Sequence, residues 1–503
     1  MMGIHQAHDE LFHYQVNLEK RVRANHPLRA VLTRVDFAFV RAEVACTYGQ
    51  NGHVSVDPVI LLKLMFLLFF DDVKSERELM ATLPERLDYL WFLGLGLDDA
   101  IPDHSVLSKA RRRWGPEVFE RLFVRTVSAC VAAGLVDGRK LHVDASLIEA
   151  NASRDSVVKS TPELIAALKA AYQAQESKLE ETTTPEGYEA VNDRTMSLSD
   201  PDASLGGKRH RNGTRPRYAH HRVVDDQCAV ITAVESTPGT IAEHKKLLEL
   251  VEQAEANTGK AVQVVVADRG YGTRENYVAC QQRGWRTHLG DRDAGKASVE
   301  ARREAAGLFG ESAFRYEESS NSFICPAGER LRPRVFNKKR ESWEYATARG
   351  VCGACALRAQ CTRSRTGRTL KRHREQALLD KARAQAHSVQ GRADRRRRQH
   401  LMEGSFAQAA NAHHFKRSRW RRLCRQRIQD WLIAAVQNIG KLIRYSRRPP
   451  GHAQGAMEAK MLILTFSTPL RSLISRFCRS LNAKLLGCAK ESELSIATAL
   501  GPL

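Results

Sequence analysis

The feature that most constrains the fold is an almost purely apolar run, Ala261–Ala267 (AVQVVVA), which ends at Asp268. β-Branched residues without polar alternation indicate a strand covered on both faces of a sheet. A second, shorter β-compatible run, Lys140–Val143 (KLHV), ends at Asp144. Since ligands of such sheets gather at the carboxyl ends of strands, we predict that Asp144 and Asp268 meet at one edge of a sheet.

The segments between these two runs complete an α/β layered unit. Strands are predicted over Arg217–Val224 and Ala229–Val234, followed by a helix over Ile241–Ala256. A strand, a hairpin, a helix and a buried strand in this order are typical of a sheet flanked by helices. The intervening residues from Asn151 to about Pro216 contain one predicted helix and otherwise have the composition of loops or disorder.

The first part of the chain, to about residue 135, has a helical pattern. Its most apolar stretch, Val59–Phe70, is too short to span a bilayer and contains Lys63, so we expect a buried helix. No secretory signal precedes it, which favours a cytoplasmic, reducing setting. The helix predicted over Ser105–Trp114 suits either a helix-turn-helix-like DNA reader or a helical bundle with a solvated basic face. Its candidate DNA-binding residues are Lys109, Arg111, Arg112 and Arg113.

The formal net charge of +22 and pI of about 9.7 predict a polyanionic partner, of which nucleic acid is the commonest. A second basic cluster lies near the C-terminal helices. Arginine is suited to bidentate phosphate contacts, so we expect this cluster to track a DNA backbone. Its members are Lys416, Arg417, Arg419, Arg421 and Arg422.

Four cysteines between the α/β unit and the last helices form a candidate zinc site: Cys325, Cys352, Cys355 and Cys361. The pair of Cys352 and Cys355 has the spacing of a zinc knuckle, and four thiolates complete a tetrahedron. The alternative is four reduced thiols without metal.

A third acid is expected on a helix near the C-terminus. Glu403 neighbours an apolar face that includes Met402 and Phe406, and Gly404 after it leaves room for DNA or metal. Glu375 and Asp380 lie in a polar helix and are interpreted as solvated. Asp394 is expected to pair with the adjoining arginines of Arg395–Arg398.

Four segments resemble DDE-type transposases of bacterial insertion sequences. They are HVDASLIEANAS, VVVADRGYGT, the run from MEGSFAQAANAHHFKRSRW to QNIGKLI, and the N-terminal stretch from HVSVDPVILLKLMFLLFF to SKARRRWG. The resemblance covers roughly residues 40–445. It implies an RNase H-like catalytic core with metal-binding acids at Asp144, Asp268 and Glu403. Ala410 stands where many relatives have a basic residue two helical turns after the glutamate.

The resemblance also implies an activity: metal-dependent phosphodiester cleavage at transposon ends and strand transfer into target DNA. Two Mg²⁺ (or Mn²⁺) ions, held by Asp144, Asp268 and Glu403, would activate the attacking oxygen and stabilise the leaving oxygen. The expected partners are double-stranded DNA, as terminal inverted repeats and target, and a second copy of the chain on DNA. Two alternatives stay open: a zinc-containing DNA-binding regulator without catalysis, and an RNase H-like nuclease that does not join strands.

The expected organisation has five parts. A helical DNA-binding domain (1–135) precedes the first part of the catalytic core (136–290). A cysteine-bearing insertion (291–390) follows, then the C-terminal helices of the core (391–447) and a tail (448–503). The predicted fold class is therefore α/β: an RNase H-like mixed sheet flanked by helices, with an all-helical N-terminal domain. In a bacterial cell, such a protein would be associated with the nucleoid.

Overall fold

The computed structural model describes residue 2 and residues 16–49, 54–158, 161–175, 196–206, 215–292 and 294–446. Residues Met1–Leu442 form one compact unit. The predicted boundaries near residues 135, 290 and 390 fall between or at the start of elements within this unit and stay predictions. The tail from 448 onward, TTTPEG and most of KRHRNGTRP lie outside the described residues. No helix among the described residues is long and apolar enough to cross a membrane.

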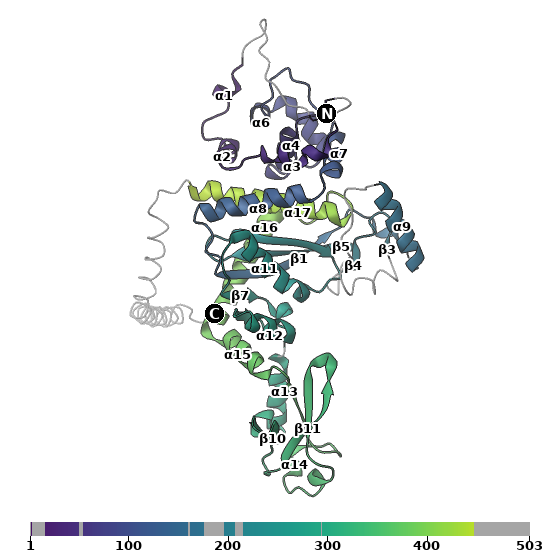
Figure 1. The fold of residues 1–503 in the computed structure, drawn as a ribbon, viewed down its shortest axis with the longest axis vertical. Coiled ribbons are helices and arrows are strands. Elements are labelled where there is room, and N and C mark those ends of the chain that lie inside the picture. The colour runs from purple at the N-terminus through teal and green to yellow at the C-terminus, as the bar shows by residue number, and fades with distance from the viewer. Residues whose placement is uncertain are drawn as a thin grey trace, which may run out of the picture. The chain divides into compact units, whose positions relative to one another are not determined.

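The N-terminal part is helical, as expected (Figure 1). Its most apolar helix, α4 (Pro58–Phe70), is buried on nearly all sides. Asp57 caps it by accepting a hydrogen bond from the Val59 N–H. Lys63 is accommodated because its Nζ donates to the Phe92 carbonyl at 2.7 Å. The other helices are α1 (Leu18–Arg21), α2 (Pro27–Arg34), α3 (Phe39–Val44), α5 (Glu76–Thr82), α6 (Leu87–Leu93), α7 (Ser105–Trp114) and α8 (Glu117–Ala132).

A mixed sheet follows, with strand order β6-β5-β1-β7-β8. The two aspartate-bearing segments are neighbours in it, because β1 pairs with β7 in parallel and β7 with β8 in parallel. β5 is antiparallel to both β1 and β6, and the short β4 (Ser204–Gly206) pairs with the start of β5. The expected mixed sheet of an RNase H-like core is confirmed. The bounds are β1 (Lys140–Glu149), β5 (Arg215–Asp225), β6 (Ile231–Pro238), β7 (Val264–Ala267) and β8 (Arg286–Leu289).

Helices pack against this sheet and supply its core. α11 (Leu247–Thr258) contacts β6 and β5, and α15 (Gln376–His387) contacts β8. α16 (Val389–Ala412) crosses β1, β7 and β8. The last helix, α17 (Leu423–Ser446), is joined to β6 through Asn438, whose amide exchanges hydrogen bonds with the Ile231 backbone. Together these helices cover the apolar β7, as its sequence requires.

The structure corrects one expectation about β1. The strand does not end at Asp144 but continues to Glu149, because β5 pairs with it along its whole length. The parallel partner stops earlier, since the last pair between β1 and β7 is Val143↔Ala267. Asp144 therefore lies within a strand, at the first position beyond the parallel pairing.

The insertion contains a second sheet that was not predicted. After α12 (Arg274–Gln282), β8 and α13 (Ala294–Ala305), five antiparallel strands pair in the order β13-β12-β11-β10-β9. A small apolar core that includes Phe314, Leu331 and Tyr345 holds them together. The bounds are β9 (Arg315–Glu317), β10 (Ser322–Ile324), β11 (Arg330–Asn337), β12 (Ser342–Ala346), α14 (Arg358–Cys361) and β13 (Thr369–His373).

Among residues 151–206, the described parts form α9 (Pro162–Gln175) and a two-stranded sheet of β2 (Val157–Val158) and β3 (Met196–Ser197).

Candidate active site

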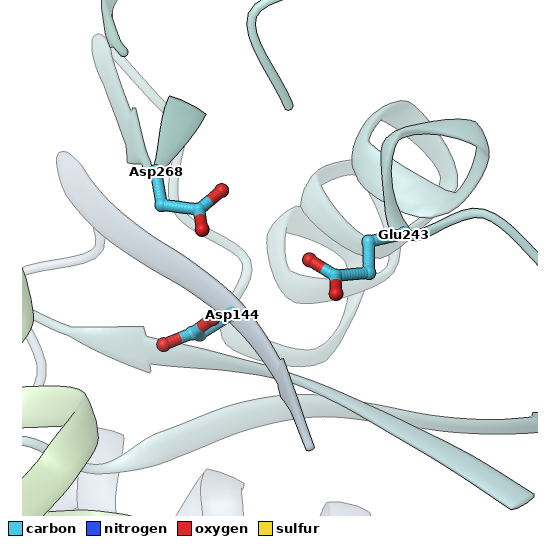
Figure 2. Close-up of side chains that lie close together, drawn as sticks. All are labelled: Asp144, Glu243 and Asp268. Atoms are coloured by element: carbon cyan, nitrogen blue, oxygen red, sulfur yellow. The ribbon is translucent and has the colours of Figure 1, made fainter. Parts of the chain in front are cut away.

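The register of β1 and β7 brings the two predicted aspartates together. Both follow the last parallel pair, so Asp144 and Asp268 occupy neighbouring positions at one edge of that pairing. A third acid joins them. Ligand oxygens of Asp144, Glu243 and Asp268 all lie within 4.8 Å of one another. Figure 2 shows Glu243 reaching from its short helix toward the two aspartates.

Asp268 is fixed by the turn that follows it. Its Oδ1 accepts a hydrogen bond of 2.7 Å from the Gly270 N–H, which caps the short helix η5 (Arg269–Tyr271). The turn packs tightly against the end of β8: a Cβ on Gly272 would lie 1.8 Å from the Gly290 carbonyl oxygen. Only glycine permits this close approach, so the sequence RGYG fixes where the carboxylate points.

Glu243 begins another short helix, η4 (Glu243–Lys246). Asn276, a buried residue of α12, holds η4 to η5, because its amide donates to the carbonyls of His244 and Tyr271 at 3.0 and 2.9 Å. The sequence analysis missed Glu243, which lies in the polar start of a predicted helix. No local signal marks it, and only the tertiary contact between η4 and η5 places it beside Asp268.

The electrostatics of the cluster favour a cation. Burial raises the pKa of Asp144, and the charge of Asp268 adds to this. The Arg398 guanidinium opposes both, with its Nη1 2.7 Å from the Asp144 Oδ2. Carboxylates gathered in a partly buried site repel one another unless a positive charge joins them. Arg398 supplies one such charge, and the oxygen-only donor set suits Mg²⁺ or Mn²⁺.

Glu403 stands apart from this cluster. α16 packs on the sheet through buried Met402, Ser405 and Ala409, whereas Glu403 is exposed and accepts a hydrogen bond from Gln399 at 3.0 Å. Its assignment as the third acid stays a prediction from the resemblance. The expected partners of Asp394 were wrong: this buried carboxylate contacts Lys140 and His288 at 3.0 and 2.7 Å, because its helical face is turned toward the sheet.

Three of the predicted DNA-binding arginines are engaged within the protein. Arg111 is buried, pairs with Glu76 and lies 4.0 Å from the Trp420 ring centroid. Arg422 is buried and its Nε donates to Asp202 at 2.6 Å. Arg419 is packed over the Phe69 ring. In this structure the three guanidinium groups contact other parts of the protein, and their role in DNA binding stays a prediction.

The other predicted basic residues are exposed: Lys109, Arg112, Arg113, Lys416, Arg417 and Arg421. Residues 413–422, which include the second basic cluster, form an irregular segment between α16 and α17. Arg417 and Arg421 line an open pocket together with Arg154 and Arg215. Glu149 also lines this pocket and pairs with Arg215, so the lining carries an excess of positive charge that suits a phosphate-bearing ligand.

The four predicted zinc ligands line a single pocket of the insertion. Their sulfur atoms nevertheless do not form a group lying within 4.8 Å of one another among the described residues. A tetrahedral site with Zn–S distances of about 2.3 Å needs closer sulfur atoms. Four thiols are suitable ligands for zinc, but their sulfur atoms lie too far apart in this structure to bind one ion. A zinc site therefore stays a proposal.

Two family models match parts of the chain. The description "Transposase domain (DUF772)" belongs to a family model that matches residues 16–113, and "Transposase DDE domain" to one that matches residues 324–443. No curated protein matches the chain. One similar solved structure is "Mos1 transposase paired-end complex with left transposon end", at 13% identity and a TM-score of 0.16. The match covers 50% of this chain and 64% of that chain, which is less than two thirds of its length.

A mixed sheet that presents neighbouring aspartates, with helices on its faces, defines an RNase H-like core. Residues 16–113 are similar to the transposase domain DUF772, and residues 324–443 to the transposase DDE domain.

Proposed function

We propose that this protein cleaves DNA phosphodiester bonds at transposon ends and transfers the resulting strand to target DNA. The observation that carries the proposal is the proximity of Asp144, Asp268 and Glu243, just beyond the last parallel pair of β1 and β7. Such an arrangement holds divalent metal, which activates the attacking oxygen and stabilises the leaving oxygen. By resemblance, Glu403 supplies a further carboxylate.

The chain's own residues prepare this chemistry. The Asp268 turn and the η4–η5 contact fix two carboxylates before substrate binds. The exposed basic residues on α7 and between α16 and α17 offer phosphate contacts. DNA with two transposon ends and a second copy of the chain are the proposed partners, because two ends must be cut and joined in one event.

Cleavage of DNA carrying the element's terminal repeats, measured with and without Mg²⁺, tests the proposal. Asp144→Asn and Asp268→Asn should abolish cleavage while DNA binding persists, because each removes a ligand charge at nearly constant shape. Glu403→Gln should do the same, with Glu375→Gln as a matched control of near-normal activity. Full cleavage by Glu403→Gln would overturn that assignment alone.

Two outcomes would favour the alternatives. A wild-type protein that binds the repeats but does not cut them with Mg²⁺ or Mn²⁺ would be a regulator. A protein that cuts but yields no joined product would be a nuclease without strand transfer.

A further inference from the structure

Glu243 has no assigned role, yet its carboxylate completes the group of oxygens around Asp144 and Asp268. We propose that Glu243 is a metal ligand, so that Asp144, Glu243 and Asp268 form a three-carboxylate site for a divalent cation that exists before DNA binds. This inference rests on the proposed function, because it concerns the same metal centre. It differs in assigning a ligand outside the Asp144, Asp268 and Glu403 set.

The backbone position of Glu243 is set by the fold. It begins η4, and η4 is tied to η5 by the two hydrogen bonds from Asn276. Gly270 lies between the carboxylates: a Cβ built there would be 3.0 Å from the Asp268 Oδ1 and 3.4 Å from the Glu243 Oε2. The absence of a side chain at Gly270 thus leaves the two acids facing one another.

A second, independent observation comes from Tyr271. The residue is fully buried, and its hydroxyl has no hydrogen-bond partner among the residues that the structure describes. The charges of Glu243, Asp144 and Asp268 all act on that hydroxyl. A buried hydroxyl without a partner costs free energy. A hydrated cation held by the three acids would bring water to this place, and such water is the missing partner.

The size and charge of the cluster also fit. Oxygen ligands of Mg²⁺ lie about 2.0–2.1 Å from the ion and those of Ca²⁺ about 2.3–2.6 Å. Two oxygens on one ion are therefore at most about 4.2 Å apart for Mg²⁺ and about 5.2 Å apart for Ca²⁺. The ligand atoms, all within 4.8 Å of one another, need close by only a few tenths of an ångström to share one Mg²⁺. Arg398 contacts Asp144. Three carboxylates gathered in one place repel one another, and a divalent cation between them would offset that repulsion.

The test is binding of Mn²⁺ to the full chain without DNA, by calorimetry or by the loss of the free-ion electron paramagnetic resonance signal. Glu243→Gln should weaken Mn²⁺ binding about 10-fold or more, a loss at the lower end of what metal sites show. Glu249→Gln is the matched control, since this exposed glutamate of α11 pairs with Lys246. Equal affinity of Glu243→Gln and wild type would overturn the inference.

A measurement on the unaltered protein covers the case in which the variant fails to fold. Fe²⁺ with ascorbate and peroxide generates hydroxyl radicals at a bound ion and cuts the nearby backbone. Cuts are expected near Asp144, Asp268 and Glu243, and their absence near Glu243 would overturn the inference. If wild type cleaves DNA but neither the Mn²⁺ affinity nor the Fe²⁺ cuts depend on Glu243 as expected, only the assignment of Glu243 as a ligand is wrong. If wild type neither binds Mn²⁺ nor cleaves DNA, the proposed function falls with it.

Discussion

Asp200 is a buried carboxyl whose protonation affects how the stability of the folded state depends on pH. It is fully buried and accepts hydrogen bonds from the Tyr218 hydroxyl at 2.6 Å and the Arg422 N–H at 3.1 Å. Asp202 lies beside it and pairs with the Arg422 side chain. Burial, with the charge of Asp202, raises the pKa of Asp200 to about 7. The carboxyl therefore keeps its proton in the folded state over a range in which the unfolded chain has lost it.

This raised pKa predicts that the contribution of Asp200 to stability falls as pH increases. The unfolded carboxyl releases its proton near pH 4, whereas the folded one does so near 7. Since the folded state binds more protons between these values, stability falls across that window and is level above it. Asp200→Asn should narrow the difference in melting temperature between pH 5 and pH 8 by about 2 °C or more. The exposed Asp380→Asn is the control, and an unchanged difference in Asp200→Asn would contradict the pKa.

At the scale of elements, the insertion joins a small sheet to a cysteine-lined pocket. Cys325 and Cys361 pack against the apolar core of the sheet. Cys352 packs closely against Gly367: a Cβ added to Gly367 would lie 2.8 Å from the Cys352 sulfur. A sheet this small buries little apolar area, so a structural metal is one way to stabilise it. We propose that the four thiols close around one Zn²⁺.

Metal analysis of purified protein should then find about one zinc per chain, because four thiolates fill one tetrahedral site. Cys352→Ser combined with Cys355→Ser should lose that zinc and make the insertion more sensitive to proteolysis. Cys46→Ser, at an exposed cysteine outside the insertion, should keep both properties. Wild-type protein that is free of zinc and equally resistant to proteolysis would show that the cysteines are ordinary thiols.

At the scale of the whole molecule, some of the residues that contribute to the net charge of +22 are buried inside the protein. Arg111, Arg222 and Arg422 are buried, and each holds other elements together. Arg222, for example, joins β5 to Ser405 of α16 and Gln437 of α17. Only the exposed part of the charge is available for DNA, so binding should depend on a smaller set of residues than the composition suggests.

Binding of the chain to its terminal-repeat DNA should weaken steeply with salt. Each phosphate contact contributes about 0.9 to the slope of log K against log salt. Arg417→Ala with Arg421→Ala, which removes two guanidinium groups of one pocket, should flatten that slope by about 2. Arg302→Ala, at an exposed position on the insertion, is the control. A slope unchanged by the double substitution would show that this pocket does not contact DNA.

The sequence by itself determined the mixed sheet, the buried helix α4 and the proximity of Asp144 to Asp268. These follow from local apolar patterns and from the rule that acids after buried strands share an edge. Only the tertiary structure decided the rest. The place of Glu243 depends on Asn276 joining η4 to η5, a contact between segments with no common pattern. Which arginines face solvent depends on partners far along the chain, such as Trp420 for Arg111. A sequence pattern records burial along one element, whereas these positions are fixed by contacts between elements.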